Sequence, residues 1–241
     1  MKNLLRNEYL THFTDSVLEA LAPIHCEICD IHIKGTTRIH RICDTCLYMF
    51  EIAPKDDVLL NTLYTHSVTD TFMFSVRSAF TFHHEAPIQR AIYAIKYGFA
   101  QQMAFDFGAY MGLHVPDIEI DALLPVPLHT ARLRERGYNQ SQSIADGISS
   151  QTKIPVIQAL QRTTYTITQT KFSSMERNKN VHGIFRVHNN QNIRGKRLML
   201  IDDVMTTGST LEACAETLLE SGALSVSAYT IAAAVSRKGI Q

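Results

Sequence analysis

Residues 198–210 read LMLIDDVMTTGST, an apolar run followed by two adjacent acids and a hydroxyl-rich loop around one glycine. The apolar run predicts a buried strand, and residues 209–222 predict a helix that follows it. In open parallel sheets, ligands lie beyond the carboxyl ends of the strands. We therefore expect Asp202 and Asp203 at a ligand-binding edge.

The loop after these acids has the composition of a phosphate site. Backbone N–H groups at a helix N-terminus carry partial positive charge, and the loop hydroxyls add donors. Gly208 permits a positive φ or a close approach of backbone to an anion, and the two carboxylates suit vicinal hydroxyls or a hydrated Mg²⁺. An alternative is an ordinary capping box formed by Ser209 and Glu212, which does not exclude phosphate binding.

The rest of the chain alternates between short apolar runs and helical patterns. We predict a strand over residues 75–82 and a helix that begins at Pro87 and ends near Gly98. Further along, the alternating segments are ALLPVPL, YNQSQSIADGISSQ, IPVIQAL, RLMLIDDV, STLEACAETLLESG and VSAYTIAAAV. This pattern is typical of an α/β fold, a parallel sheet with flanking helices.

The N-terminal part differs in character. Residues 3–21 predict an amphipathic helix, and its acidic residues exclude a signal peptide or a membrane span, so we expect a cytoplasmic protein. We divide the chain into an N-terminal module, residues 1–60, and an α/β domain, residues 61–241.

Four of the five cysteines, Cys26, Cys29, Cys43 and Cys46, form two C-x-x-C pairs separated by thirteen residues. In a reducing compartment this spacing favours a tetrahedral structural zinc site over two disulfides or incidental thiols. The intervening residues suggest a short hairpin that turns at Gly35. Cys214 stands alone in a helical pattern and is interpreted as a small core residue.

The net charge of zero hides a segregation of charge. Residues 129–197 hold 12 Lys and Arg against 3 Asp and Glu, a net charge near +9. Such a concentration implies an anionic partner, either the phosphates of a small molecule or a nucleic-acid backbone. A solvated surface remains the alternative, although solvated faces usually mix signs.

The segment LMLIDDVMTTGST resembles the phosphoribosyl pyrophosphate (PRPP) motif of type I phosphoribosyltransferases. That resemblance implies that Asp202 and Asp203 face the ribose hydroxyls in the presence of Mg²⁺. It also implies a cradle for the 5′-phosphate formed by Met205, Thr206, Thr207, Gly208, Ser209 and Thr210.

Other stretches resemble the ComF family of competence-associated proteins. These are AIKYGF, PVPLHTARLRERGYNQSQSIA, RTTYTITQTKFSSMERNKNVHGIFRV and the four-cysteine module. The family resemblance implies a pyrophosphate loop at Pro127 and Leu128, with Arg132 and Arg136 on or just after it. It also implies a closing loop that carries Arg177, expected to act on the transferring group.

Some residues near these stretches have simpler interpretations. Asn139 is a candidate helix N-cap, and Tyr138 could equally stack on a base or pack in the interior. Lys96 and Tyr97, at a helix end, are most simply a solvated lysine and a packed tyrosine.

Two functions follow. The first is phosphoribosyl transfer from PRPP to an unidentified acceptor, as in nucleotide salvage. The second, which we favour, is a PRPP-binding scaffold that handles single-stranded DNA during uptake, since the basic segment contains Tyr138, Tyr165, Phe172 and Phe185. Candidate DNA contacts are Arg132, Arg136, Tyr138, Lys179 and Arg194. A third, weaker interpretation makes the cysteine module a docking site for a DNA-uptake partner protein.

Overall fold

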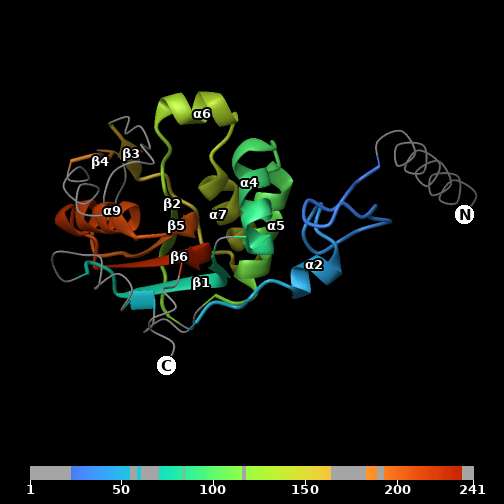
Figure 1. Cartoon of the computed structure of the whole chain (residues 1–241). Coiled ribbons are helices and arrows are strands. Elements are labelled where there is room, and N and C mark those ends of the chain that lie inside the picture. Colours follow the sequence, from blue (N-terminus) through green and yellow to red (C-terminus); the bar gives the residue numbers. More distant parts are fainter. Residues whose placement is uncertain are drawn as a thin grey trace, which may run out of the picture.

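Four strands form the parallel sheet that the alternating pattern predicts, in the order β1-β6-β5-β2 (Figure 1). The computed structural model describes residues 23–54, 59–60, 71–83, 85–115, 118–163, 183–188 and 193–234. The strands are β1 (Ser75–Phe82), β2 (Ala122–Pro125), β5 (Arg197–Met205) and β6 (Ser225–Ala234). Because all four run in the same direction, Asp202 and Asp203 lie toward the carboxyl edge, as expected.

Helices cover both faces of this sheet. On one side lie α4 (Pro87–Tyr97), α5 (Gln101–Gly112) and α7 (Gln140–Thr152), and on the other lies α9 (Ser209–Glu220). Successive residues of a strand point to opposite faces, so Met199 and Ile201 pack with the first group while Leu198 and Leu200 pack with α9. All four are fully or almost fully buried, which explains the unbroken apolar run of β5.

Glycines allow α5 and α7 to pack closely. A Cβ atom on Gly108 would lie 2.0 Å from the carbonyl oxygen of Ile144, and one on Gly147 would lie 2.1 Å from that of Phe105. Neither position can accept a side chain without moving the backbone. The close contact fixes α7 against the body, and the first turn of α7 reaches the end of β5.

The sequence-based expectations are mostly confirmed. The strand over residues 75–82 and the helix from Pro87 to Tyr97, followed by Gly98, match the structure. The run at 154–160 contributes one bridge pair, Leu123 with Val156, to the described sheet edge. It then enters β3 (Leu160–Arg162), which pairs antiparallel with β4 (Phe185–Val187). Helices α5 and α6 (Thr130–Arg136) were not anticipated, and residues 3–21 lie outside the described residues.

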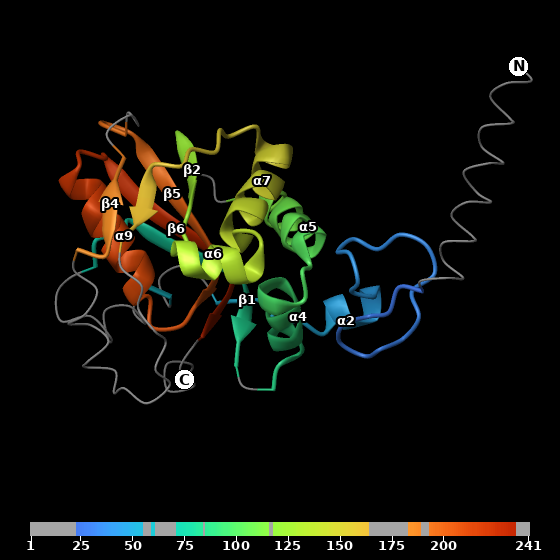
Figure 2. The ribbon, with the colours of Figure 1, turned by 90° about the horizontal axis from the view of Figure 1, so that it is seen from above.

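The cysteine-containing segment, with the short helix α2 (Asp44–Tyr48), packs beside α4 and α5 (Figure 2). The ring of Phe50 lies 5.2 Å from that of Phe80 and 6.3 Å from that of Phe107, and the backbone N–H of His40 donates to Asp106 Oδ2 at 2.8 Å. This segment therefore shares one apolar core with the sheet's helical face. Among the described helices, none is long and apolar enough to cross a membrane.

The expected hairpin around Gly35 is wrong. Gly35 does adopt a positive φ of 80°, but the bridge pairs are His25 with His32 and Ile39 with Ile42. Each bridge pair is local to one cysteine pair. The two cysteine turns are joined by the backbone N–H of Glu27, which donates to the carbonyl of Arg41 at 2.9 Å, instead of by strands paired across Gly35.

Candidate functional site

A pocket lies at the carboxyl end of β5, where the strand turns into α9. It is lined by Asp202 and by every residue from Val204 to Leu211. Gly208 has φ +76° and is the N-cap of α9, a left-handed conformation that strains other residues. The hydroxyls of Thr207 and Ser209 lie 2.9 Å apart. The structure thus brings together the whole predicted cradle, Met205 to Thr210, at the N-terminus of a helix.

The capping-box alternative for Ser209 and Glu212 is wrong. Gly208, not Ser209, is the N-cap, and no side chain makes a capping hydrogen bond at the start of α9 in the described part of the chain. The carboxylate of Glu212 instead accepts from the Thr71 hydroxyl and, at 3.0 Å, from the backbone N–H of Phe72. Glu212 therefore anchors the segment that precedes β1.

Asp202 is fixed by two hydrogen bonds to one oxygen. Its Oδ1 accepts from the Ser141 hydroxyl and from the backbone N–H of Asp203, both at 2.9 Å. Burial, followed by the negative charge of Asp203, raises the pKa of Asp202 to about 7. Asp202 thus titrates near neutral pH, unlike an ordinary surface carboxyl.

Asp203 is 3% exposed and is paired with a cation from another element. Its Oδ1 lies 3.1 Å from Nζ of Lys96, in the last turn of α4. Its Oδ2 is buried and has no hydrogen-bond partner among the described residues. The interpretation of Lys96 as a solvated lysine is therefore wrong, because the side chain is only 25% exposed and forms an ion pair inside the site.

The proposed pyrophosphate loop follows β2, and α7 is tied to it. Asn139, the N-cap of α7 as predicted, accepts from the backbone N–H of Ser141 at 3.1 Å and donates to the carbonyl of Val126 at 3.1 Å. This residue joins the chain just before Pro127 and Leu128 to the first turn of α7. It thereby holds Ser141 beside Asp202.

The arginines expected beside that loop differ in environment. Arg132 is partly exposed on α6, whereas Arg136 is 7% exposed, donates to Gln140 Oε1 at 3.0 Å and lies over the ring of Tyr97, 5.3 Å from its centroid. Tyr97 itself is 46% exposed, so its interpretation as a packed tyrosine is wrong.

Tyr138 is partly buried and is held in place by a hydrogen bond to α4. Its hydroxyl donates to the carbonyl of Ile95, and burial raises its pKa to about 12. Of the two interpretations of Tyr138, packing matches the structure.

The candidate DNA contacts do not lie on one described surface. Arg194 is exposed but precedes β5, so it lies at the amino edge of the sheet, opposite Asp202. Phe185 is buried. Arg177, Lys179, Tyr165 and Phe172 lie outside the described residues.

Sequence reasoning missed Arg162, at the end of β3. Burial lowers its pKa, and Arg132 and Asp202 are among the charges that act on it. Its position depends on β3 pairing with β4, more than twenty residues away in the sequence, so no local pattern identifies it.

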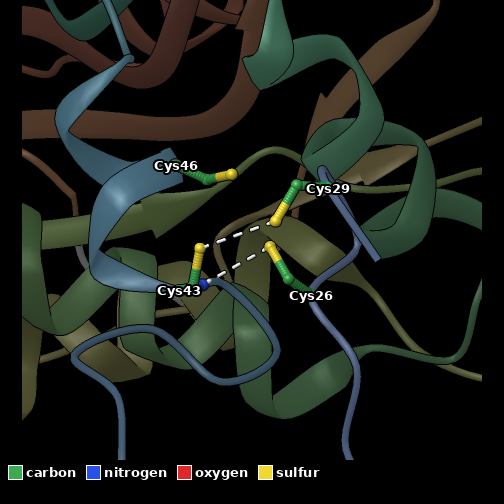
Figure 3. Close-up of side chains that lie close together, drawn as sticks. All are labelled: Cys26, Cys29, Cys43 and Cys46. Atoms are coloured by element: carbon green, nitrogen blue, oxygen red, sulfur yellow. Dashed lines mark hydrogen bonds between the residues drawn. The ribbon is translucent and has the colours of Figure 1, made fainter. Parts of the chain in front are cut away.

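The four N-terminal cysteines form a candidate metal centre (Figure 3). All four are free thiols, and their sulfur atoms lie within 4.8 Å of one another. The Cys29 and Cys43 sulfurs are 3.7 Å apart, close to the separation of about 3.8 Å that follows from a tetrahedral ion with metal–sulfur bonds of about 2.3 Å. This donor set could hold Zn²⁺.

Backbone groups support a thiolate at Cys26. Burial raises the pKa of Cys26, but hydrogen bonds from the backbone of Cys43, Cys29 and Ile28 lower it more strongly, and the balance is about 7. One of these donors, the N–H of Cys43, lies 3.4 Å from the Cys26 sulfur. A thiolate is the form that ligates metal. Burial raises the pKa of Cys43 and of Cys46, so the backbone favours the thiolate at Cys26 and not at those two residues.

Residues 109–239 match the Phosphoribosyl transferase domain family. Among solved structures, glutamine PRPP amidotransferase from Bacillus subtilis aligns with 53% of this chain and 26% of its own, at 24% identity and a TM-score of 0.38.

Curated relatives have names associated with competence and DNA. Competence protein ComFC of Bacillus subtilis is 30% identical over 199 residues, which cover 80% of this chain and 72% of that protein. Competence protein F of Haemophilus influenzae is 33% identical over 116 residues, 47% of this chain and 51% of the relative. The DNA utilization protein YhgH of Escherichia coli K12 is 33% identical over 121 residues, 50% of this chain and 51% of the relative.

The chain thus spans about half the length of the last two relatives and nearly three quarters of the first. The domain match covers the acidic motif of β5 and most of the parallel sheet described above. The chain belongs to the ComF family of proteins with a phosphoribosyl transferase domain.

Proposed function

We propose that this protein binds PRPP with Mg²⁺ at the pocket of Asp202 and Val204–Leu211, and that it handles single-stranded DNA during DNA uptake. The observation that supports the first part is the pocket itself, in which Asp202 lies beside the N-terminus of α9, where no side chain makes a capping hydrogen bond in the described part of the chain. Such a terminus favours an anion, and the hydroxyls of Thr207 and Ser209 add donors. The 5′-phosphate is assigned to this loop.

The ribose and the pyrophosphate of PRPP would lie beside Asp202 and Asp203. Asp203 Oδ2 is a buried acceptor with no partner among the described residues, and a buried acceptor left in this way costs about 1–3 kcal/mol. A ribose hydroxyl or a water of hydrated Mg²⁺ would satisfy it. When bound, Mg²⁺ would offset the charge of the pyrophosphate, while Arg132 would face the same group from α6.

The competence role and the DNA part draw on the relatives and on charge. Relatives are named for competence and for DNA utilization. Around the described carboxyl edge, α6 contributes Arg132 and the exposed Arg134, and β3 contributes Arg162. We therefore place single-stranded DNA on this side of the molecule, where it can approach the pocket, and not at the amino edge that carries Arg194.

Calorimetry with PRPP tests the central assignment. The wild type should bind PRPP with Mg²⁺, and Asp202→Asn with Asp203→Asn should abolish that binding while the circular dichroism spectrum is retained. Equal affinity in the wild type and the double variant would contradict the proposal. Release of pyrophosphate on addition of free nucleobases would instead favour phosphoribosyl transfer, the alternative function.

The DNA part has a separate test. Mobility shifts with single-stranded DNA should weaken steeply with salt, because the backbone contacts release counterions. Absence of binding at low salt, with PRPP binding intact, would remove DNA from the proposed function and leave the PRPP site.

A further inference from the structure

Three aromatic side chains on α4 and just after its end are exposed to solvent. Tyr93 is 66% exposed, Tyr97 is 46% exposed and Phe99 is 76% exposed. We call these three residues the aromatic patch. None of them belongs to the pocket described above, and large aromatic side chains that gather on a surface usually mark an interaction site.

The patch has a defined geometry. Tyr93 and Tyr97 are four residues apart on α4, so they lie on the same face, and their ring centroids are 4.8 Å apart. Phe99 has φ +52°, a left-handed conformation that costs a bulky residue about 1–2 kcal/mol. The backbone is thus held in a strained form at the residue that presents the most exposed ring of the patch.

The patch is continuous with the basic helix α6. Arg136 lies over the ring of Tyr97, and Cε1 of Phe99 lies 3.9 Å from the place where a Cβ of Gly137 would be. Figures 1 and 2 both show the end of α4 beside α6. Helix α6 carries Arg132, Arg134 and Arg136 against one acid, Glu135.

We propose that the aromatic patch is a stacking platform for the bases of single-stranded nucleic acid, with the partly exposed Arg132 and the exposed Arg134 of α6 holding the backbone beside it. Exposed rings next to arginines suit bases and phosphates together, because every base has a face that can stack and every nucleotide carries a charge. Charge complementarity favours this occupant over an apolar protein segment. The inference rests on the DNA part of the proposed function and names the residues that carry it.

Two single-stranded oligonucleotides, one with bases and one without, test whether the aromatic patch stacks on bases. Fluorescence anisotropy compares a labelled 20-mer of thymidine with an abasic 20-mer of equal charge. The wild type should prefer the thymidine strand, and Tyr93→Ala with Phe99→Ala, which leaves only Tyr97 of the patch, should reduce the preference at least about fivefold, since one stack contributes about 5- to 150-fold in affinity. Phe74→Ala is the matched control: Phe74 is 68% exposed but lies at the opposite edge, just before β1.

Salt dependence separates stacking from charge. The aromatic double variant should shift the plot of log K against log salt without changing its slope. Arg134→Ala should instead reduce the slope by about 0.7, the contribution of one phosphate on a single strand.

Each other outcome is distinct. Equal wild-type affinity for both strands would overturn the platform and leave DNA binding through the backbone intact. No binding to either strand would remove the DNA part of the proposed function as well. If the double variant keeps its preference for thymidine but changes its elution volume on size exclusion, the patch is a protein interface and the inference is wrong.

Discussion

Nζ of Lys96 lies 3.1 Å from Oδ1 of Asp203, and this ion pair joins the last turn of α4 to the carboxyl end of β5. Asp203 is almost fully buried, so Lys96 supplies the countercharge that a buried carboxylate needs. The pair therefore joins the helix that bears Tyr93 and Tyr97 to the residue that follows Asp202, the acid that lines the pocket.

Removal of this countercharge should be costly. Lys96→Met should lower the free energy of unfolding by about 1–3 kcal/mol, less than for a fully buried pair because Lys96 is 25% exposed. Thermal and urea denaturation measure the change, and Lys96→Arg, which keeps the charge, should restore most of the loss. Lys96→Met should lower the free energy of unfolding by less in the Asp203→Asn background than in the wild type. Equal losses in both backgrounds would show that the two residues do not interact.

The pKa of Asp202 predicts a pH dependence. Because the folded-state pKa, about 7, is above the unfolded value near 4, the folded state holds a proton that the unfolded state releases. This contribution is fully present below about pH 4 and is lost as the pH rises to about 7. Urea denaturation at several pH values should show this decline in the wild type and a flatter profile in Asp202→Asn; identical profiles would contradict it.

Gly208 is required by the shape of the loop Met205–Thr210, the proposed phosphate site. Gly208→Ala places a Cβ on a residue with φ +76° and should weaken PRPP binding at least about tenfold, because relief of the strain moves the first amides of α9. Gly195→Ala is the matched control, at φ +68° with open space around it and at the amino edge. It should lose similar stability and keep its affinity. Equal affinities in calorimetry for both variants would argue against the loop as the binding element.

The cysteine cluster should hold one metal ion. Freshly purified reduced protein should contain about one zinc per chain by elemental analysis, and Cys43→Ser should lower both zinc content and melting temperature, since binding is coupled to folding. Cys214→Ala removes a buried cysteine outside the cluster and should leave zinc content unchanged. Zinc-free protein that melts at the same temperature with or without added zinc would contradict the assignment.

The sequence predicts well those elements that follow local rules. The apolar run of β5, the proline that begins α4 and Asn139 at the start of α7 were all identified correctly. Two C-x-x-C pairs identified the sulfur cluster for the same reason, since ligands close in sequence converge on one point. The loop from Met205 to Thr210, which lines the pocket, is likewise one continuous segment.

Contacts between distant segments were not predictable. Lys96 and Asp203 are more than a hundred residues apart, and so are Thr71 and Glu212, whose hydrogen bond replaces the expected capping box. Periodicity also gave no sign that Arg136 would be buried while Tyr97 remained exposed. These features depend on how α4, α6 and β5 meet, which only the tertiary structure shows.

A crystal structure of the protein with PRPP and Mg²⁺ tests the central claim most directly. Electron density for the 5′-phosphate should lie against the Thr206–Thr210 loop at the N-terminus of α9, with the ribose hydroxyls or the hydrated Mg²⁺ at Asp202 and Asp203. Density for PRPP at another place, with this loop unchanged and empty at saturating ligand, would contradict it.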